Sequence, residues 1–225
     1  MEGGPEGLAR DMSAPVAAKR TPWERDDASF PADMFRTWLD CLTRPTEFFE
    51  SLDPGIPFAR PLLFFLVVWV LGSGLGTLSV QTTLGDLIAE SYAAEGRGPP
   101  GTAWNLFVFF LSPFVGLLAL ALNVAFIHVG VRLFVHRPRP IGSTARSLCY
   151  VVAPQVLALV PFFGWIVAPI WGFVLTVIAV RMTHRTTVGR SIAAVLVPPI
   201  VFWFAFVMLL GFLVIFVMLA VESAA

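Results

Sequence analysis

Charge is scarce in this chain of 225 residues, and 11 of its 15 acidic residues precede residue 60. Only 13% of the residues are charged, against roughly 25% in soluble domains. By contrast, 57% are hydrophobic and the mean hydropathy is +0.80. No Asp or Glu occurs between residues 96 and 221. This composition excludes a soluble globular protein and predicts an integral membrane protein.

Residues that carry chemistry are also few. The two cysteines, Cys41 and Cys149, fall in an amphipathic stretch and in an apolar run, which does not support a disulfide framework or a zinc site. None of the three histidines has a carboxylate near it in sequence, and neither Gly-x-Ser-x-Gly nor His-Glu-x-x-His occurs. We therefore predict no catalytic, cofactor-binding or metal-binding residues and no enzyme activity. The net charge of zero likewise gives no reason to expect a nucleic-acid partner.

The N-terminal part lacks the hydrophobic segment of a signal peptide. Residues 1–29 are rich in Gly, Pro, Ala and mixed charge, so we predict a disordered cytoplasmic tail. In residues 30–53 apolar side chains recur on one helical face, which predicts short amphipathic helices at the membrane surface. The pattern leaves open whether they pack against the cytoplasmic ends of the spans or contact lipid. These side chains are Met34, Phe35, Trp38, Leu39, Leu42, Phe48, Phe49 and Leu52.

Long apolar runs fill residues 54–225. Because lipid cannot hydrogen-bond to the backbone, runs of this length must cross the membrane as helices. The predicted fold class is therefore an all-α polytopic integral membrane protein, with five transmembrane helices preceded by the short interfacial helices. We expect a polar loop at residues 82–102, a kink at Pro113 and a break in the last span near Pro198 and Pro199. The predicted spans are about 61–80, 108–133, 147–163, 165–181 and 199–221.

The arginines predict the orientation of these spans. The loops after the second and fourth predicted spans carry six arginines, whereas the connections after the first and third carry only Arg97. Because positive charge favours the cytoplasmic side, both termini can be assigned: the N-terminus is predicted to be cytoplasmic and the C-terminus outside. The basic loops could also attract anionic lipid headgroups.

Polar residues within the second span are the first candidates for a site. This span contains Asn123 and His128, and Arg132 follows four residues after the histidine on the same helical face. They could form a polar site inside the bundle. Alternatively, Asn123 could make an interhelical hydrogen bond while His128 and Arg132 lie at the membrane interface.

Residues 150–171 form two apolar segments joined by a charge-free turn, which predicts a helical hairpin. Gly164 in that turn is expected to serve a tight connection rather than chemistry. The pattern here resembles the third and fourth spans of the Yip-one family, in its bacterial form. Residues 38–39 and 44–52 resemble the family's segment before the first span, and the similarity covers roughly residues 34–220. The other matching positions are Tyr150, Pro154, Pro161, Gly164, Trp171, His184, Ala193, Ala194 and Pro198.

The resemblance implies an all-helical membrane domain with a cytoplasmic N-terminus. In eukaryotic members it also implies binding of Rab-type GTPases and work in vesicle traffic. The Asp-Leu-Tyr-Gly-Pro stretch that those members carry has no counterpart in residues 1–60, which puts a GTPase partner in doubt. Arginine greatly outnumbers the single lysine, Lys19, as expected for a GC-rich bacterial genome and hence the bacterial cytoplasmic membrane.

Two functional hypotheses follow from the sequence. The first is a non-enzymatic module that binds other membrane proteins, associates with itself or organises lipid, with a trafficking-like role. The alternative is a passive channel or transporter for a small solute or ion, since no carboxylate lies within the predicted spans to couple transport to an ion. Neither hypothesis requires a cofactor.

Overall fold

The computed structural model describes residues 20–52, 57–96, 98, 101–160 and 162–224, and every regular element in these ranges is helical. Two short helices, α1 (Ala32–Thr43) and α2 (Pro45–Glu50), precede the long helices α3 (Ala59–Ala94) and α4 (Thr102–Phe134). The rest of the chain forms α5 (Ile141–Val151), α6 (Phe163–His184) and α7 (Val188–Ala224). Two 3-10 helices complete the order: η2 (Pro22–Glu24) before α1 and η3 (Ala153–Leu159) after α5.

Within the described residues, three helical stretches are long and apolar enough to cross a membrane. They are Ala103–Phe134 in α4, Phe163–His184 in α6 and Val188–Phe216 in α7, and α3 adds a shorter apolar stretch at Ala59–Gly74. The all-helical class and the membrane location are therefore confirmed. The count of five spans stays a prediction.

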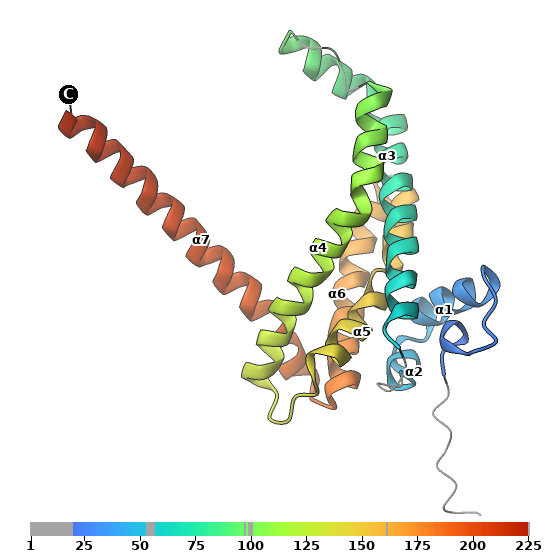
Figure 1. Cartoon of the computed structure of the whole chain (residues 1–225). Helices are drawn as coiled ribbons and strands as arrows, with labels where there is room; N and C mark the ends of the chain where they lie inside the picture. Colours follow the sequence, from blue (N-terminus) through green and yellow to red (C-terminus); the bar gives the residue numbers. More distant parts are fainter. Residues whose placement is uncertain (1–19, 53–56, 97, 99–100, 161, 225) are drawn as a thin grey trace, which may run out of the picture.

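Helices α3 to α6 form a bundle, with α1 and α2 packed at one end of it (Figure 1). The α4–α5 connection and the α6–α7 turn lie at that same end, while the C-terminal part of α7 extends away from the bundle. Of the apolar side chains predicted on the amphipathic face of α1 and α2, Met34, Phe48 and Phe49 are buried, whereas Phe35 and Leu39 remain 58% and 43% exposed. This face therefore packs in part against the bundle and remains open in part.

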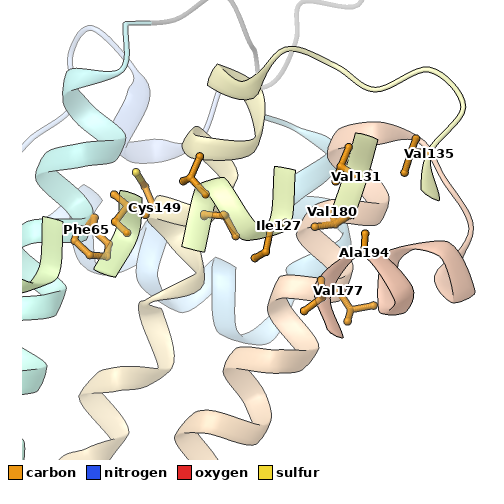
Figure 2. Close-up of a cluster of buried hydrophobic side chains, with 12 residues drawn as sticks. Phe65, Ile127, Val131, Val135, Cys149, Val177, Val180 and Ala194 are labelled. Atoms are coloured by element: carbon orange, nitrogen blue, oxygen red, sulfur yellow. The ribbon is translucent and has the colours of Figure 1, made fainter. Parts of the chain in front are cut away.

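The centre of the bundle is a cluster of buried apolar side chains from five helices. Figure 2 shows Phe65 of α3, Ile127 and Val131 of α4, and Cys149 of α5 in this cluster, together with residues of α6 and α7. Because lipid tails are as apolar as these side chains, the cluster holds the helices together by close van der Waals packing. A second buried cluster joins α1, α2 and η2 to α3, α5, η3 and α6, and it includes Phe49, Phe64 and Tyr150.

Several elements differ from the sequence prediction. Helix α3 continues to Ala94 instead of yielding to a polar loop at residue 82, because Gly85 alone interrupts an otherwise helix-compatible stretch without proline. Gly96 follows two residues after the end of the helix, and its positive φ of 69° suits glycine. The predicted third span is not one helix: α5 ends at Val151, and Pro154, which has no backbone N–H, lies at the start of η3.

Residues 20–29, the described part of the predicted disordered tail, are not disordered throughout. Residues 1–19 lie outside the described residues, but Pro22–Glu24 is a 3-10 helix in which Trp23 and Glu24 are buried. The reason is a set of specific contacts. The Trp23 indole N–H donates to the Arg60 carbonyl at 2.8 Å, and the Trp23 backbone N–H donates to the Thr37 hydroxyl at 2.9 Å.

The predicted break at Pro198 is wrong, since α7 runs through both prolines. Pro198 cannot donate a hydrogen bond to the carbonyl of Ala194, four residues earlier. That carbonyl lies against Gly130 of α4, where a Cβ atom would overlap it. The Ala194 carbonyl, which has no N–H of residue 198 to accept from, therefore packs against Gly130 where α4 and α7 approach closely.

Candidate functional site

Helix α5 is short, central and unusually polar for a buried element. Thr144, Arg146, Ser147 and Tyr150 are all buried, together with Leu148 and Cys149. Burying a polar or charged group costs free energy unless a partner satisfies it. The partners of these side chains form two clusters, one on each side of the helix.

The carboxylate cluster consists of Glu24, Arg146 and Tyr150. The Arg146 Nε–H donates to Glu24 Oε1 at 3.0 Å, and the Tyr150 hydroxyl donates to the same oxygen at 2.9 Å. The Glu24 side chain is 0% exposed and that of Arg146 is 5% exposed. Arg146 and Tyr150 are four residues apart and therefore share one face of α5. A charged pair from segments 122 residues apart thus fixes η2 against the centre of the bundle.

Contacts around η2 explain why Glu24 reaches this position. Arg60 at the start of α3 donates through NH1 to the Trp23 carbonyl at 2.9 Å, and its guanidinium lies 5.9 Å from the centroid of the Trp23 ring. The same guanidinium also donates to the Arg25 carbonyl. The backbone on both sides of Glu24 is therefore held from α3, which directs the carboxylate toward α5.

Helix α1 is attached to the same region through its polar atoms. The Trp38 indole N–H donates to the Ala153 carbonyl at 2.8 Å, where the backbone changes from α5 to η3. The Cys41 thiol donates to the Tyr150 carbonyl at 3.4 Å. Burial raises the pKa of the Cys41 thiol, so it stays protonated and acts as a hydrogen-bond donor.

The histidine cluster joins His128 of α4, Thr144 of α5 and His184 of α6. The Thr144 hydroxyl lies 3.0 Å from His128 Nδ1 and 3.0 Å from His184 Nε2. The backbone N–H of Arg139 donates to His184 Nδ1 at 3.1 Å. All three side chains are buried, so the cluster connects three helices inside the bundle.

The backbone donor fixes the direction of the hydrogen bonds that His184 makes. Because Arg139 N–H can only donate, His184 Nδ1 must accept, and the proton of this ring must be on Nε2. His184 Nε2–H then donates to the Thr144 oxygen. The Thr144 hydroxyl also lies 3.0 Å from His128 Nδ1 and thus bridges the two rings.

The chemistry open to these clusters is limited by their burial. A threonine hydroxyl beside histidines resembles a nucleophile with a base, but catalysis requires a substrate within reach of the reacting atom. Thr144 is 0% exposed. In the described part of the chain no three His, Cys, Asp or Glu side chains come together in a group that could hold a metal ion. The arrangement is suited to joining helices.

The eight positions singled out from the sequence are distributed as follows. His128 and His184 are brought together, and Tyr150 belongs to the carboxylate cluster. Asn123 is exposed and its side-chain amide donates to the Ala119 carbonyl of its own helix at 3.0 Å, so it joins no cluster.

The remaining positions lie around the hairpin. Pro154 is buried in η3, and Trp171 is half-buried against the second apolar cluster. A Cβ atom at Gly164 would overlap the Leu157 carbonyl, so η3 and α6 approach closely there. Pro161 lies outside the described residues.

Sequence reasoning missed Glu24, Thr144 and Arg146. Glu24 lies in a polar segment that reads as a tail, and its only local signal is the adjacent Pro22 and Trp23. Arg146 was counted with the cytoplasmic arginines. Its position four residues before Tyr150, next to an apolar run, was the available signal for a buried pair.

A family model described as "Yip1 domain" matches residues 39–211. This range includes α5, both histidines and the arginine of the ion pair, while Glu24 precedes it. No curated protein and no solved structure matches the chain. Since the matched range covers most of the sequence and includes two of the three stretches able to cross a membrane and most of the third, the chain belongs to the Yip1 domain family of membrane proteins, the family resembled by its sequence motifs.

Proposed function

We propose that this protein is a non-enzymatic module of the bacterial cytoplasmic membrane, which binds other membrane proteins or a second copy of itself through the outer part of α7. The observation that carries the proposal is the exposure of this helix. Every large hydrophobic side chain from residue 200 to residue 216 is exposed, including Phe204 at 68% and Phe212 at 70%. In Figure 1 the C-terminal part of α7 extends away from the bundle, and Phe202, whose ring centroid lies 5.1 Å from that of Phe126 in α4, still contacts the bundle.

The contrast between the two parts of α7 supports a protein partner for the outer part in addition to lipid. Helices in a bilayer associate through close van der Waals packing, because lipid tails are as apolar as the side chains. The first part of α7 uses such packing against α4, where Gly130 meets the Ala194 carbonyl. Beyond Phe202, which packs on Phe126 of α4, the helix extends away from the bundle and its large side chains remain exposed. Its aromatic side chains offer large contact areas to another helix.

The proposed topology has five spans, with the N-terminus in the cytoplasm and the C-terminus outside. Helix α3 has 36 residues, or about 54 Å at about 1.5 Å per residue, which is enough to cross. Helix α5 and η3 together reach about 30 Å, because the 3-10 part rises about 2.0 Å per residue. This length matches the hydrocarbon core of about 30 Å.

The arrangement of the polar clusters supports a non-enzymatic role. The carboxylate and histidine clusters consist of buried side chains that bond to one another across helices. Such groups hold the bundle together and present a defined surface to partners. The bundle would then act as a support for α7 and for the cytoplasmic helices α1 and α2.

A co-purification census from native membranes tests the proposal. Wild-type protein is compared with the double variant Phe204→Ala/Phe212→Ala and with the control Phe114→Ala/Ile166→Ala. The control side chains are as exposed, at 68% and 63%, but lie on α4 and α6. We expect specific partner proteins, or the chain itself, to be lost only from the α7 variant.

The opposite outcome would favour the alternative function. If no protein is recovered above background with wild type, and purified protein in liposomes lets a small solute or ion pass, the passive channel is correct and the interaction role is wrong.

A further inference from the structure

A cavity of about 340 Å³ lies between α2, the start of α5 and the C-terminal end of α6, and four arginines line it. They are Arg139, Arg146, Arg181 and Arg185, while Glu50 is the one acidic residue in its wall. We propose that this cavity binds a phosphate ester, as the headgroup of an anionic phospholipid or as a free phosphate compound.

The charge balance of the cavity favours an anion. Arg146 is paired with Glu24, and one further arginine can be balanced by Glu50. Among the described residues, no carboxylate forms an ion pair with Arg139, Arg181 or Arg185. About two positive charges thus remain, which suits a phosphate group with one or two negative charges.

Two hydroxyl groups add donors of the kind that phosphate oxygens accept. Ser143 lies in the first turn of α5 and lines the cavity, where the positive end of the helix dipole also favours an anion. Thr186 lines it too, and its buried Oγ1 has no hydrogen-bond partner within the described residues. A bound phosphate oxygen would satisfy that hydroxyl.

The backbone at Arg185 provides a separate indication. Arg185 follows the last residue of α6 with φ 49° and ψ 51°. This left-handed conformation is strained for most side chains and is usually taken by glycine or asparagine at the end of a helix. Glycine would fit this backbone conformation with less strain, yet the position carries an arginine that lines the cavity.

The arginines could instead serve only to orient the spans, since positive charge is favoured on the cytoplasmic side. That role depends on charge and not on where the charge lies within the loops. A phosphate site depends on arginine at these positions, because the planar guanidinium offers paired donors that lysine lacks. Variants that remove equal charge inside and outside the cavity therefore separate the two explanations.

The experiment uses the full purified chain in a zwitterionic detergent, in phosphate-free buffer of fixed ionic strength. Short-chain phosphatidylglycerol, short-chain phosphatidylcholine and inorganic phosphate are titrated separately, and the rise in the thermal unfolding midpoint gives an apparent affinity. Arg181→Gln/Arg185→Gln tests the cavity. Arg137→Gln/Arg190→Gln removes the same charge from nearby exposed positions that do not line it.

We expect the cavity variant to weaken phosphatidylglycerol binding about tenfold or more, since two charge-assisted contacts are lost, and the control variant to change it less than about twofold. Stabilisation by phosphatidylglycerol alone identifies a lipid headgroup as the source. Stabilisation by inorganic phosphate, in competition with the lipid, identifies a free phosphate compound.

Equal weakening by both double variants would overturn the proposal, because it shows that no defined anion site exists. Equal binding of phosphatidylcholine, whose phosphate diester sits in a headgroup of zero net charge, would refute the preference for an anionic headgroup. If the cavity variant does not fold, Arg185→Lys replaces it. This change keeps the charge and the spans' orientation, and we expect it to weaken binding several-fold. Unchanged binding in Arg185→Lys would also refute the site.

Discussion

Replacing Glu24 by methionine tests whether the buried ion pair holds the segment before α1 against the bundle. Methionine has a similar volume, so the change removes the carboxylate without opening a large cavity. Arg146 would lose the carboxylate that its Nε–H contacts at 3.0 Å, and Tyr150 would lose the acceptor of its hydroxyl at 2.9 Å. Breaking a buried charged pair costs about 3–5 kcal/mol.

The related variants should follow a definite order. Tyr150→Phe removes one hydrogen bond to a charged group and should cost about 1.5–3 kcal/mol. The double variant Glu24→Met/Arg146→Met replaces the pair by apolar side chains and should be more stable than Glu24→Met alone. Asp26→Ala breaks an ion pair with Arg20 in which Asp26 is 94% exposed, and we expect no measurable change in stability.

The assay is the free energy of unfolding of the purified chain, measured by titration with a denaturing detergent. Limited trypsin digestion adds a local readout, since release of η2 should speed cleavage after Arg25. A Glu24→Met variant that is as stable as Asp26→Ala, with unchanged digestion, would refute the conclusion that the ion pair anchors this segment.

Three further predictions use other parts of the structure. Gly164→Leu should lower folded yield and thermal stability sharply, because its side chain would collide with the Leu157 carbonyl, whereas the same change at the open Gly172 should be tolerated. Thr144→Val should cost about 1–3 kcal/mol in unfolding free energy, because it removes the hydroxyl that bonds both histidines and leaves their ring nitrogens without this partner, whereas Thr144→Ser, which keeps the hydroxyl, should retain most of the stability. The backbone N–H of Ser29, which donates to the Asp33 carboxylate, is the chief cause that lowers the pKa of Asp33. The ionised carboxylate therefore stabilises the fold above the ordinary pKa of 3.8, and this stabilisation is lost as the pH falls below that value. The stability difference between wild type and Asp33→Asn should therefore disappear in acid, and a difference that grows with falling pH would contradict this assignment.

Features that depend on local pattern could be predicted from the sequence. The apolar runs of α4, α6 and α7 and the amphipathic stripe of α1 are visible because hydrophobicity and its helical period are local properties. The family resemblance was also visible, and the family match confirms it. Element ends were less accurate, as the continuation of α3 to Ala94 shows.

The clusters could not be predicted because they depend on pairing between distant segments. His128 and His184 were each singled out, but only the folded bundle places Thr144 between them. Glu24 reads as part of a solvated tail, and its burial depends on an arginine 122 residues away. The continuity of α7 through Pro198 likewise depends on a glycine of α4 that receives the Ala194 carbonyl.

The central claim, that the outer part of α7 is a surface for another protein in the membrane, is tested most directly by site-specific photocrosslinking in intact cells. A photoreactive amino acid is placed at Phe212 on α7 and, as the control, at Phe114 on α4. We expect discrete protein adducts, including any dimer of the chain, from position 212 and none from position 114. Lipid adducts alone at both positions would contradict the claim.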